Sequence, residues 1–121
     1  MGTTHLLDSK PNNLHWGAFS AEFDPVLKIK SGDQVVIETI SGGHNQIPPE
    51  KMNELLPDHE LFLSNDRKPI LPGHILTGPI FVEGAAPGDA LEVRIIDIEL
   101  RQDWAWNMIA PLRGSLPEDF P

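Results

Sequence analysis

Proline and glycine constrain this chain more than any other feature. There are 12 Pro and 10 Gly among 121 residues, scattered between short apolar runs. Proline interrupts helices and central strands, while glycine adopts the positive φ that tight turns require. The pattern favours short strands joined by turns over long helices, so we expect an all-β fold. A chain of this length can bury one modest core, and we expect residues 1–121 to form a single domain.

Net charge and cysteine content narrow the function classes. The formal net charge is -9 at pH 7, and phosphate backbones are bound by cationic surfaces, so we expect no nucleic-acid partner. No apolar run has the length of a membrane span, and the N-terminus lacks the pattern of a signal peptide. We therefore expect no membrane association and a cytoplasmic protein. The absence of Cys excludes a disulfide scaffold, a thiolate metal site and a cysteine nucleophile.

Two strands around a tight turn are predicted between residues 27 and 40. Apolar residues alternate in 27–30, a Ser-Gly-Asp turn follows at 31–33, and a second apolar run covers 34–40. A Gly-Asp pair recurs at residues 88–89, again before a β-branched run. An internal duplication would explain the recurrence, but Gly-Asp before a strand is common turn chemistry.

Residues 91–100 carry a strand pattern that changes phase. Apolar residues occupy positions 91, 93 and 95, and then positions 96, 98 and 100, with charged residues between them. A period of two cannot change phase without an extra residue. We expect a bulge or bend near Ile95-Ile96, as in strands that turn a corner of a barrel or jelly roll. The alternative is that both faces of the strand are buried at that point.

One segment is a good helix candidate. In residues 48–56, Pro49 suits the first turn, and Met52, Leu55 and Leu56 have the spacing i, i+3, i+4. Pro57 is expected to stop this helix. Residues 58–72 are mostly polar, and we expect them to form a long excursion over the surface.

The chain lacks the sequence motifs of several catalytic classes. It has no Gly-x-Ser-x-Gly elbow, no phosphate-binding P-loop and no dinucleotide-binding glycine motif. With cysteine also absent, water is the expected nucleophile if the protein is an enzyme. Water needs a general base or a metal ion at neutral pH, so histidines and carboxylates are the candidate residues.

None of the five histidines pairs with another at a short metal-ligand spacing, so any metal site must combine distant segments. For His5 and His59 we expect a surface or internally satisfied imidazole. His15 precedes a Trp-Gly pair, and His44 follows a Gly-Gly pair in a loop after a strand. Such loops are where rigid scaffolds hold reactive groups, although a plain turn is the alternative.

Glu83 is an acidic residue in an otherwise apolar run. Ile80 and Val82 share one face of the predicted strand, and Phe81 and Glu83 share the other. The carboxylate either lies at the solvated rim of a sheet or points into a cleft, where burial would raise its pKa. The sequence leaves both alternatives open.

The same region resembles a known family. Its residues read His74-x-x-Thr77-Gly78-Pro79-Ile80-x-Val82-Glu83-Gly84-Ala85-x-Pro87-Gly88-Asp89-x-Leu91, followed by Asp97-Ile98. This pattern resembles the acetamidase/formamidase family, and residues 15–17, 25–27 and 31–33 look like the N-terminal part of that family. Residues 101–107 are similar to its aromatic segment, with Ala105 where a glycine is usual. The resemblance runs over nearly the whole chain.

The resemblance implies a fold and an activity. The fold would be a jelly-roll-like sandwich or partly open barrel with one short helix. The activity would be hydrolysis of the C–N bond of short linear amides such as formamide and acetamide, or of lactams, by activated water. Family members are more than twice this length, so the chain resembles the N-terminal portion of a larger β/α protein. The implied partners are a small amide substrate and either further copies in a homo-oligomer or a C-terminal-half polypeptide.

Site residues follow from the matched positions. Glu83 is the expected general base or metal ligand, and His74 the expected proton donor to the leaving amine or a ligand. Thr77 is expected to orient the substrate, although it also suits a turn cap. Trp104 is expected to pack in a core or subunit contact, or to line an apolar pocket around the substrate.

The resemblance also implies a divalent metal, zinc or calcium, with His44 and His15 as the expected ligands from this part of the chain. Oxyanion stabilisation would come from the metal or from backbone N–H groups of a glycine loop. The alternative function is a non-catalytic β module, or a subunit fragment of such an enzyme, that keeps the shape of the fold without the reactive residues.

Overall fold

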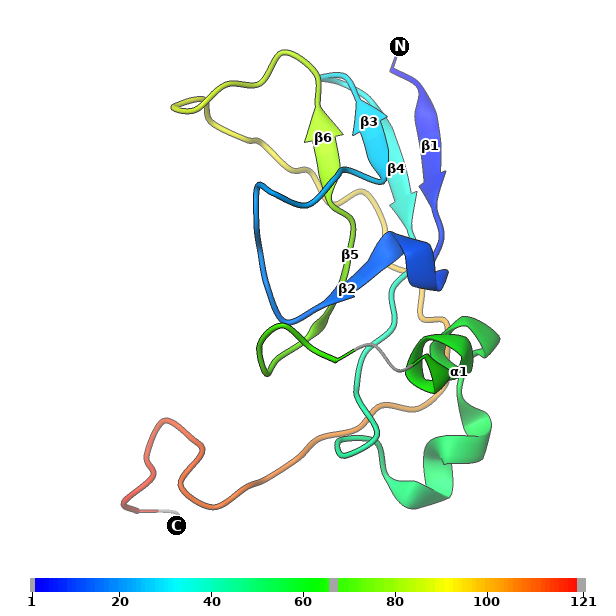
Figure 1. Ribbon diagram of the computed structural model, residues 1–121, viewed down its shortest axis with the longest axis vertical. Helices are drawn as coiled ribbons and strands as arrows, with labels where there is room; N and C mark the ends of the chain where they lie inside the picture. The colour runs from blue at the N-terminus through cyan, green and yellow to red at the C-terminus, as the bar shows by residue number, and fades with distance from the viewer. Residues whose placement is uncertain (1, 66–67, 120–121) are drawn as a thin grey trace. The chain divides into compact units, whose positions relative to one another are not determined.

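The computed structural model describes residues 2–65 and 68–119. Their contacts divide the chain into two compact units, one that ends at Leu91 and one that begins at Glu92. All the helices and strands identified in the described residues belong to the first unit (Figure 1).

Short strands in open two-stranded sheets make up the first unit. The described residues form three such sheets. They are parallel β1 (Thr4–Leu7) with β4 (Gln34–Ile37), antiparallel β2 (Leu14–Trp16) with β5 (Ile75–Thr77), and parallel β3 (Leu27–Ile29) with β6 (Ile80–Val82). The expectation of a strand-rich fold with few helices is confirmed. No sheet closes into a barrel within the described residues.

The two strands predicted between residues 27 and 40 form on either side of the predicted turn. The Asp33 N–H donates to the Lys30 carbonyl at 3.0 Å, and Gly32 has a φ of 88°, which glycine adopts without strain. The two strands do not pair with each other, because β3 pairs with β6 and β4 pairs with β1.

Asp33 ties this turn to β1. Its carboxylate accepts the Lys30 N–H at 2.9 Å and the Thr3 N–H at 2.8 Å, and it lies 3.0 Å from Nε2 of His5. These hydrogen bonds, those of the two backbone N–H groups first, lower the pKa of Asp33 to about 2, because each favours the charged carboxylate. The ring of His5 is therefore internally satisfied, as expected.

The helical segments differ from the prediction. Residues 48–56 contain a 3-10 helix, η2 (Pro49–Glu54), rather than an α-helix, and none of its residues is buried. The α-helix is α1 (Pro57–Ser64), where a stop and a surface excursion were expected, so both predictions were wrong. Pro57 starts the helix, because proline at the first helical position loses no hydrogen bond.

Two further features of α1 explain its position. Asp58 and Glu60 lie in its first turn, where carboxylates interact favourably with the helix dipole. His59, Phe62 and Leu63 are buried at the spacing i, i+3, i+4 that gives one helix face. These positions therefore predict a helix. It was missed because residues 58–72 are mostly polar and were expected to form a loop.

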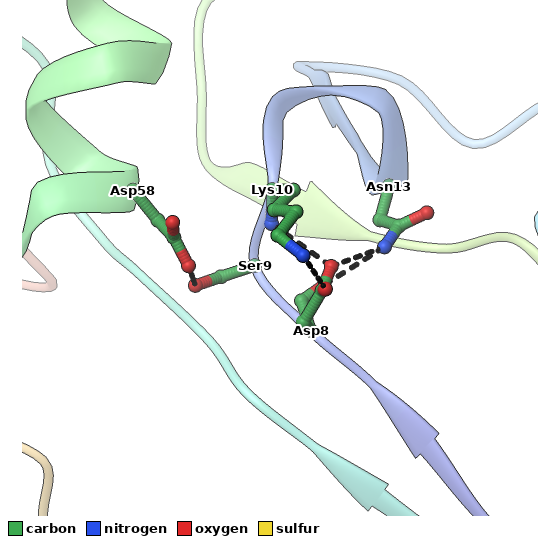
Figure 2. Close-up of polar contacts among 5 residues, drawn as sticks. All are labelled: Asp8, Ser9, Lys10, Asn13 and Asp58. Atoms are coloured by element: carbon green, nitrogen blue, oxygen red, sulfur yellow. Dashed lines mark hydrogen bonds and ion pairs between the residues drawn. The ribbon is translucent and has the colours of Figure 1, made fainter.

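A buried serine connects α1 to the segment after β1. Ser9 is fully buried, and its hydroxyl donates to the Asp58 carboxylate at 3.0 Å (Figure 2). The neighbouring Asp8 accepts a 2.6 Å hydrogen bond from the Asn13 side chain and lies 2.9 Å from Nζ of Lys10. Lys10 is the main cause of the lowered pKa of Asp8. These contacts fix the short 3-10 helix η1 (Pro11–Asn13) that leads into β2.

Trp16 is half-buried and connects the β2–β5 sheet to helix α1. Its ring packs against Phe62 with centroids 5.7 Å apart, and its Nε1–H donates to the Gly73 carbonyl at 3.2 Å. A Cβ on Gly43 would lie 2.8 Å from the Trp16 ring, so a larger residue there would displace the ring. The buried apolar side chains are Leu7, Leu14, Ile40, Ile47, Leu55, Phe62, Leu63 and Ile75.

Residues 91–100 do not form the predicted strand or bulge. They have no regular secondary structure, and every side chain is exposed. A strand requires a neighbouring strand for its backbone hydrogen bonds, and no described segment pairs with this one. The alternative, burial of both faces, is also wrong.

The second unit consists of turns and irregular structure within the described residues. An isolated bridge joins Ala110 to Arg113, and Trp104 and Trp106 are half-buried. None of the helices in residues 2–65 and 68–119 has the length and apolar character that crossing a membrane requires.

A pair of glycine substitutions tests the close approach of Gly17, just after Trp16, to the backbone of Leu71. Gly17 and Gly32 have similar positive φ values, 85° and 88°, but a Cβ on Gly17 would lie 1.8 Å from the Leu71 carbonyl oxygen, whereas one on Gly32 meets nothing within 4 Å. Gly32→Ala should therefore lower the free energy of unfolding only by the cost of a positive φ at a residue that has a Cβ, about 1–2 kcal/mol. Gly17→Ala should lower the free energy of unfolding by clearly more, measured by urea titration. Equal losses would show that Gly17 and Leu71 do not approach in this way.

His59 should make stability depend on pH. It is buried, its Nε2 lies 2.8 Å from the Gly42 carbonyl oxygen, and burial lowers its pKa. The unfolded chain therefore binds a proton at a higher pH than the folded chain. The stability that comes from the neutral His59 is complete above the ordinary histidine pKa of about 6.5. It is lost as the pH falls below that value.

The matched variant is His59→Gln, whose side-chain amide keeps a donor for the Gly42 carbonyl but does not titrate. We expect its free energy of unfolding to change less than that of the parent chain between about pH 7.5 and pH 5.5. Identical pH profiles for the two chains would contradict the burial of a neutral His59.

Candidate functional site

A surface hollow lies beside His15 in the first unit. Its volume is about 470 Å³, and we call it the His15 hollow. The residues that line it are His15, Phe19, Ser20, Ala21, Phe23, Leu76, Thr77 and Pro79. It combines aromatic and aliphatic walls with one imidazole and two hydroxyl groups, the usual mixture of a small-molecule site.

The pairing of β2 with β5 positions His15. His15 lies opposite Leu76, and Leu14 lies opposite Thr77. The pairing is extended at both ends, where the Gly17 N–H donates to the His74 carbonyl at 3.0 Å and the Gly78 N–H donates to the Asn13 carbonyl at 2.8 Å. His15 is therefore held on a hydrogen-bonded strand rather than on a free loop.

The surroundings of His15 fix which ring nitrogen carries the proton. Its Nδ1 lies 3.3 Å from the Gly78 carbonyl oxygen. Because a carbonyl only accepts hydrogen bonds, Nδ1 is the donor, and Nε2 of the neutral ring keeps its lone pair. The ring also packs edge-on against Phe23, with centroids 4.9 Å apart. An imidazole oriented in this way can accept a proton or bind a cation at Nε2.

Thr77 lines the same hollow as His15. Its hydroxyl makes a long 3.5 Å hydrogen bond to the Glu38 carbonyl, so the oxygen lone pairs are available to a ligand donor. Of the side chains predicted from the sequence to form a site, the structure brings these two together.

Glu83 and His74 lie apart from the hollow. Glu83 follows β6, where its N–H donates to the Ile29 carbonyl at 2.8 Å, and His74 directly precedes β5. Both side chains are exposed, and neither lines the His15 hollow. Of the two alternatives for Glu83, the solvated rim of a sheet is the one found.

The expected metal ligands do not meet. His44 is exposed, with its Nε2 3.1 Å from the Leu63 carbonyl oxygen near the end of α1, and it does not line the His15 hollow. In residues 2–65 and 68–119, no three His, Asp or Glu side chains are grouped so that they could hold a metal ion. A catalytic zinc site uses three protein ligands, so these residues alone do not complete one. The divalent metal stays a prediction.

Several residues of the hollow were missed by sequence reasoning. Phe19 and Phe23 stand four positions apart, and the turn between them is held by the Glu22 N–H, which donates to the Ser20 hydroxyl at 3.1 Å. The sequence feature that could have predicted them is the presence of two aromatic residues close to a His-Trp-Gly segment. Trp104, predicted to contact substrate or pack in a core, lies in the second unit and is half-buried there.

Comparison with known proteins identifies the family. The model of the Acetamidase/Formamidase family matches residues 4–114. No curated protein and no solved structure matches the chain significantly. The match covers most of the chain, including both strands that carry the His15 hollow and the segment around Glu83. The chain therefore belongs to the acetamidase/formamidase family.

Proposed function

We propose that this protein hydrolyses the C–N bond of short linear amides, such as formamide or acetamide, to ammonium and a carboxylate. The match of the family to residues 4–114 carries the proposal. Water is the proposed nucleophile, because the chain contains neither cysteine nor a Gly-x-Ser-x-Gly motif. The jelly-roll-like fold, the cytoplasmic location and a homo-oligomeric assembly, or association with a C-terminal-half polypeptide, belong to the same proposal.

The His15 hollow supports the proposal as the substrate site. Its volume of about 470 Å³ falls in the range of small-molecule sites, about 300–1,000 Å³. Phe19 and Phe23 offer apolar surface to the alkyl group of an amide, and Thr77 offers a hydroxyl to its polar end. A lactam presents the same amide group with a larger apolar part.

His15 can move the protons of the reaction. Nε2 accepts a proton from water while the water oxygen attacks the amide carbonyl carbon and forms a tetrahedral intermediate. The imidazolium then returns this proton to the nitrogen as the C–N bond breaks, so that ammonia and a carboxylic acid leave, and a proton passes from the acid to ammonia to give the carboxylate and ammonium. The Gly78 carbonyl, which accepts from Nδ1–H, favours the imidazolium during this step.

Glu83 and His74 remain the base and acid that the resemblance implies. They lie at the ends of β6 and β5, which belong to different sheets, so their use would place the reaction outside the His15 hollow. A divalent cation bound to His15 or His44 would lower the pKa of a bound water, but the described residues do not complete such a centre. The proton path proposed here depends on His15 alone.

The non-catalytic alternative is favoured by one observation. The two residues expected to be catalytic, Glu83 and His74, are both exposed. A β module that serves as a subunit would show this arrangement without binding an amide. Ammonia release distinguishes the two functions.

A histidine variant tests the proposed function and the role of His15 together. His15→Asn keeps a donor for the Gly78 carbonyl but has no basic nitrogen. We expect ammonia release from formamide or acetamide, weak for the chain alone and stronger when a C-terminal-half polypeptide is supplied. We expect His15→Asn to lower kcat by roughly 10²–10⁴-fold, the usual contribution of a general base, with little change in KM. His5→Gln, which alters a histidine of the β1–β4 sheet, is the control and should keep the parent rate.

Other outcomes of the ammonia-release assay lead to different conclusions. If Glu83→Gln or His74→Asn abolishes turnover while His15→Asn does not, the sequence-based assignment holds and the role of His15 is wrong. If added zinc or calcium raises the rate and a chelator removes it in the parent chain, the predicted metal is supported. Absence of ammonia release from either amide, with or without added metal and with or without a C-terminal-half polypeptide, contradicts the proposed function and favours the non-catalytic module.

A further inference from the structure

The His15 hollow is larger and more apolar than formamide or acetamide requires. Its volume is about 470 Å³, within the range of about 300–1,000 Å³ in which pockets enclose most of a drug-sized ligand. Two phenylalanines, a leucine, a proline and an alanine make up most of its lining. A ligand that fills the hollow therefore carries an apolar group larger than a hydrogen atom or a methyl group.

Phe19 and Phe23 occupy different places in this lining. The Phe23 ring packs edge-on against the His15 ring, with centroids 4.9 Å apart, so it forms the wall beside the imidazole. Phe19 also lines the hollow, but it is 91% exposed. A large apolar ring that stays in water at a pocket offers surface whose burial by a ligand is favourable. Phe19 is therefore the outer, uncovered wall of the hollow.

The loop that carries both phenylalanines is fastened to the opposite wall of the hollow. It connects β2 to β3 (Figure 1). At its start the Gly17 N–H donates to the His74 carbonyl at 3.0 Å, and at its end the Val26 N–H donates to the Pro79 carbonyl at 2.9 Å. Both acceptors flank β5, whose Leu76 and Thr77 line the other side. A wall held in this way is formed before a ligand arrives, which lowers the cost of binding.

The described residues that line the hollow include no Asp, Glu, Lys or Arg. Its polar groups are the imidazole of His15 and the hydroxyls of Ser20 and Thr77, and the formal net charge of the chain is -9. A carboxylate that entered this space would lose hydration without gaining a Lys or Arg partner. The hollow therefore favours an uncharged apolar group over an acidic one.

We propose that the His15 hollow selects linear amides whose acyl chain is uncharged, apolar and longer than that of acetamide, and that Phe19 determines this preference. The inference rests on the proposed function, which places the amide group at His15. A methyl group beside His15 meets Phe23, whereas a longer chain also covers the ring of Phe19. Each fully buried CH₂ group raises affinity about fourfold. Because the hollow is open to solvent at Phe19, burial is partial, and we expect pentanamide to bind roughly tenfold more tightly than acetamide.

Binding of three amides to the full chain tests the substrate class. The probes are acetamide, pentanamide and succinamate, whose chain resembles that of pentanamide in length but ends in a carboxylate. Ring NMR shifts of His15 report each Kd, and where an amide is turned over, kcat/KM is compared instead. Pentanamide should bind most tightly, and succinamate no more tightly than acetamide. Equal binding of pentanamide and acetamide, or tighter binding of succinamate than of pentanamide, would overturn the proposed class.

A phenylalanine variant tests the role of Phe19. Phe19→Ala should reduce the preference for pentanamide over acetamide from roughly tenfold to roughly twofold or less, with little change in the Kd of acetamide. The matched control is Phe81→Ala, because Phe81 is also exposed but lies on β6 and does not line the hollow. It should keep the parent preference. A preference that Phe19→Ala leaves unchanged, or that both variants lower equally, would show that Phe19 does not determine it.

The binding measurements and the ammonia assay fail separately. If ammonia is released from acetamide and pentanamide but the two bind equally, the proposed function stands and the inferred preference is overturned. If pentanamide binds in a manner that depends on Phe19 but no ammonia is released, hydrolysis is contradicted and the selective site is supported. A His15 ring whose shifts respond to neither amide overturns the inference, whatever the ammonia assay shows.

Discussion

The pairing of β2 with β5 is the contact on which the rest of the first unit depends. It joins residues that are far apart in sequence, with His15 opposite Leu76 and Trp16 opposite Ile75. On one side it places Trp16 against Phe62 of α1, so the sheet and the helix share a core. On the other side it brings His15 to Thr77 and to the Gly78 carbonyl. The same backbone hydrogen bonds thus organise both the packing and the candidate site.

Local features of the fold could be predicted from the sequence, and long-range pairing could not. The turn at residues 31–33 and its two strands follow from glycine, aspartate and alternating apolar residues, which act over a few positions. Which strand pairs with which depends on contacts between distant segments, and β3 and β4 pair with β6 and β1 instead of each other. Helix α1 was missed because Pro57 has opposite meanings at the start and at the end of a helix.

The candidate site shows the same limit. Family resemblance pointed to Glu83 and His74 because their motif is the most specific, and geometry pointed to His15 because a carbonyl fixes its tautomer beside a hollow. The motif could not reveal that the Glu83 and His74 side chains are exposed, because exposure depends on residues from other segments of the chain. Residues 91–100 show this limit too, since their alternating apolar pattern predicted a strand, but no described segment pairs with them.

The orientation of His15 is the central claim, and nitrogen NMR of the imidazole tests it directly. In a folded sample at a pH where the ring is neutral, the account predicts that Nδ1 of His15 carries the proton and Nε2 does not, because Nδ1 donates to the Gly78 carbonyl. Ring nitrogen shifts and their couplings to ring protons distinguish the two tautomers. A His15 that is protonated on Nε2 would contradict the account, since the hollow would then be lined by a donor instead of a base.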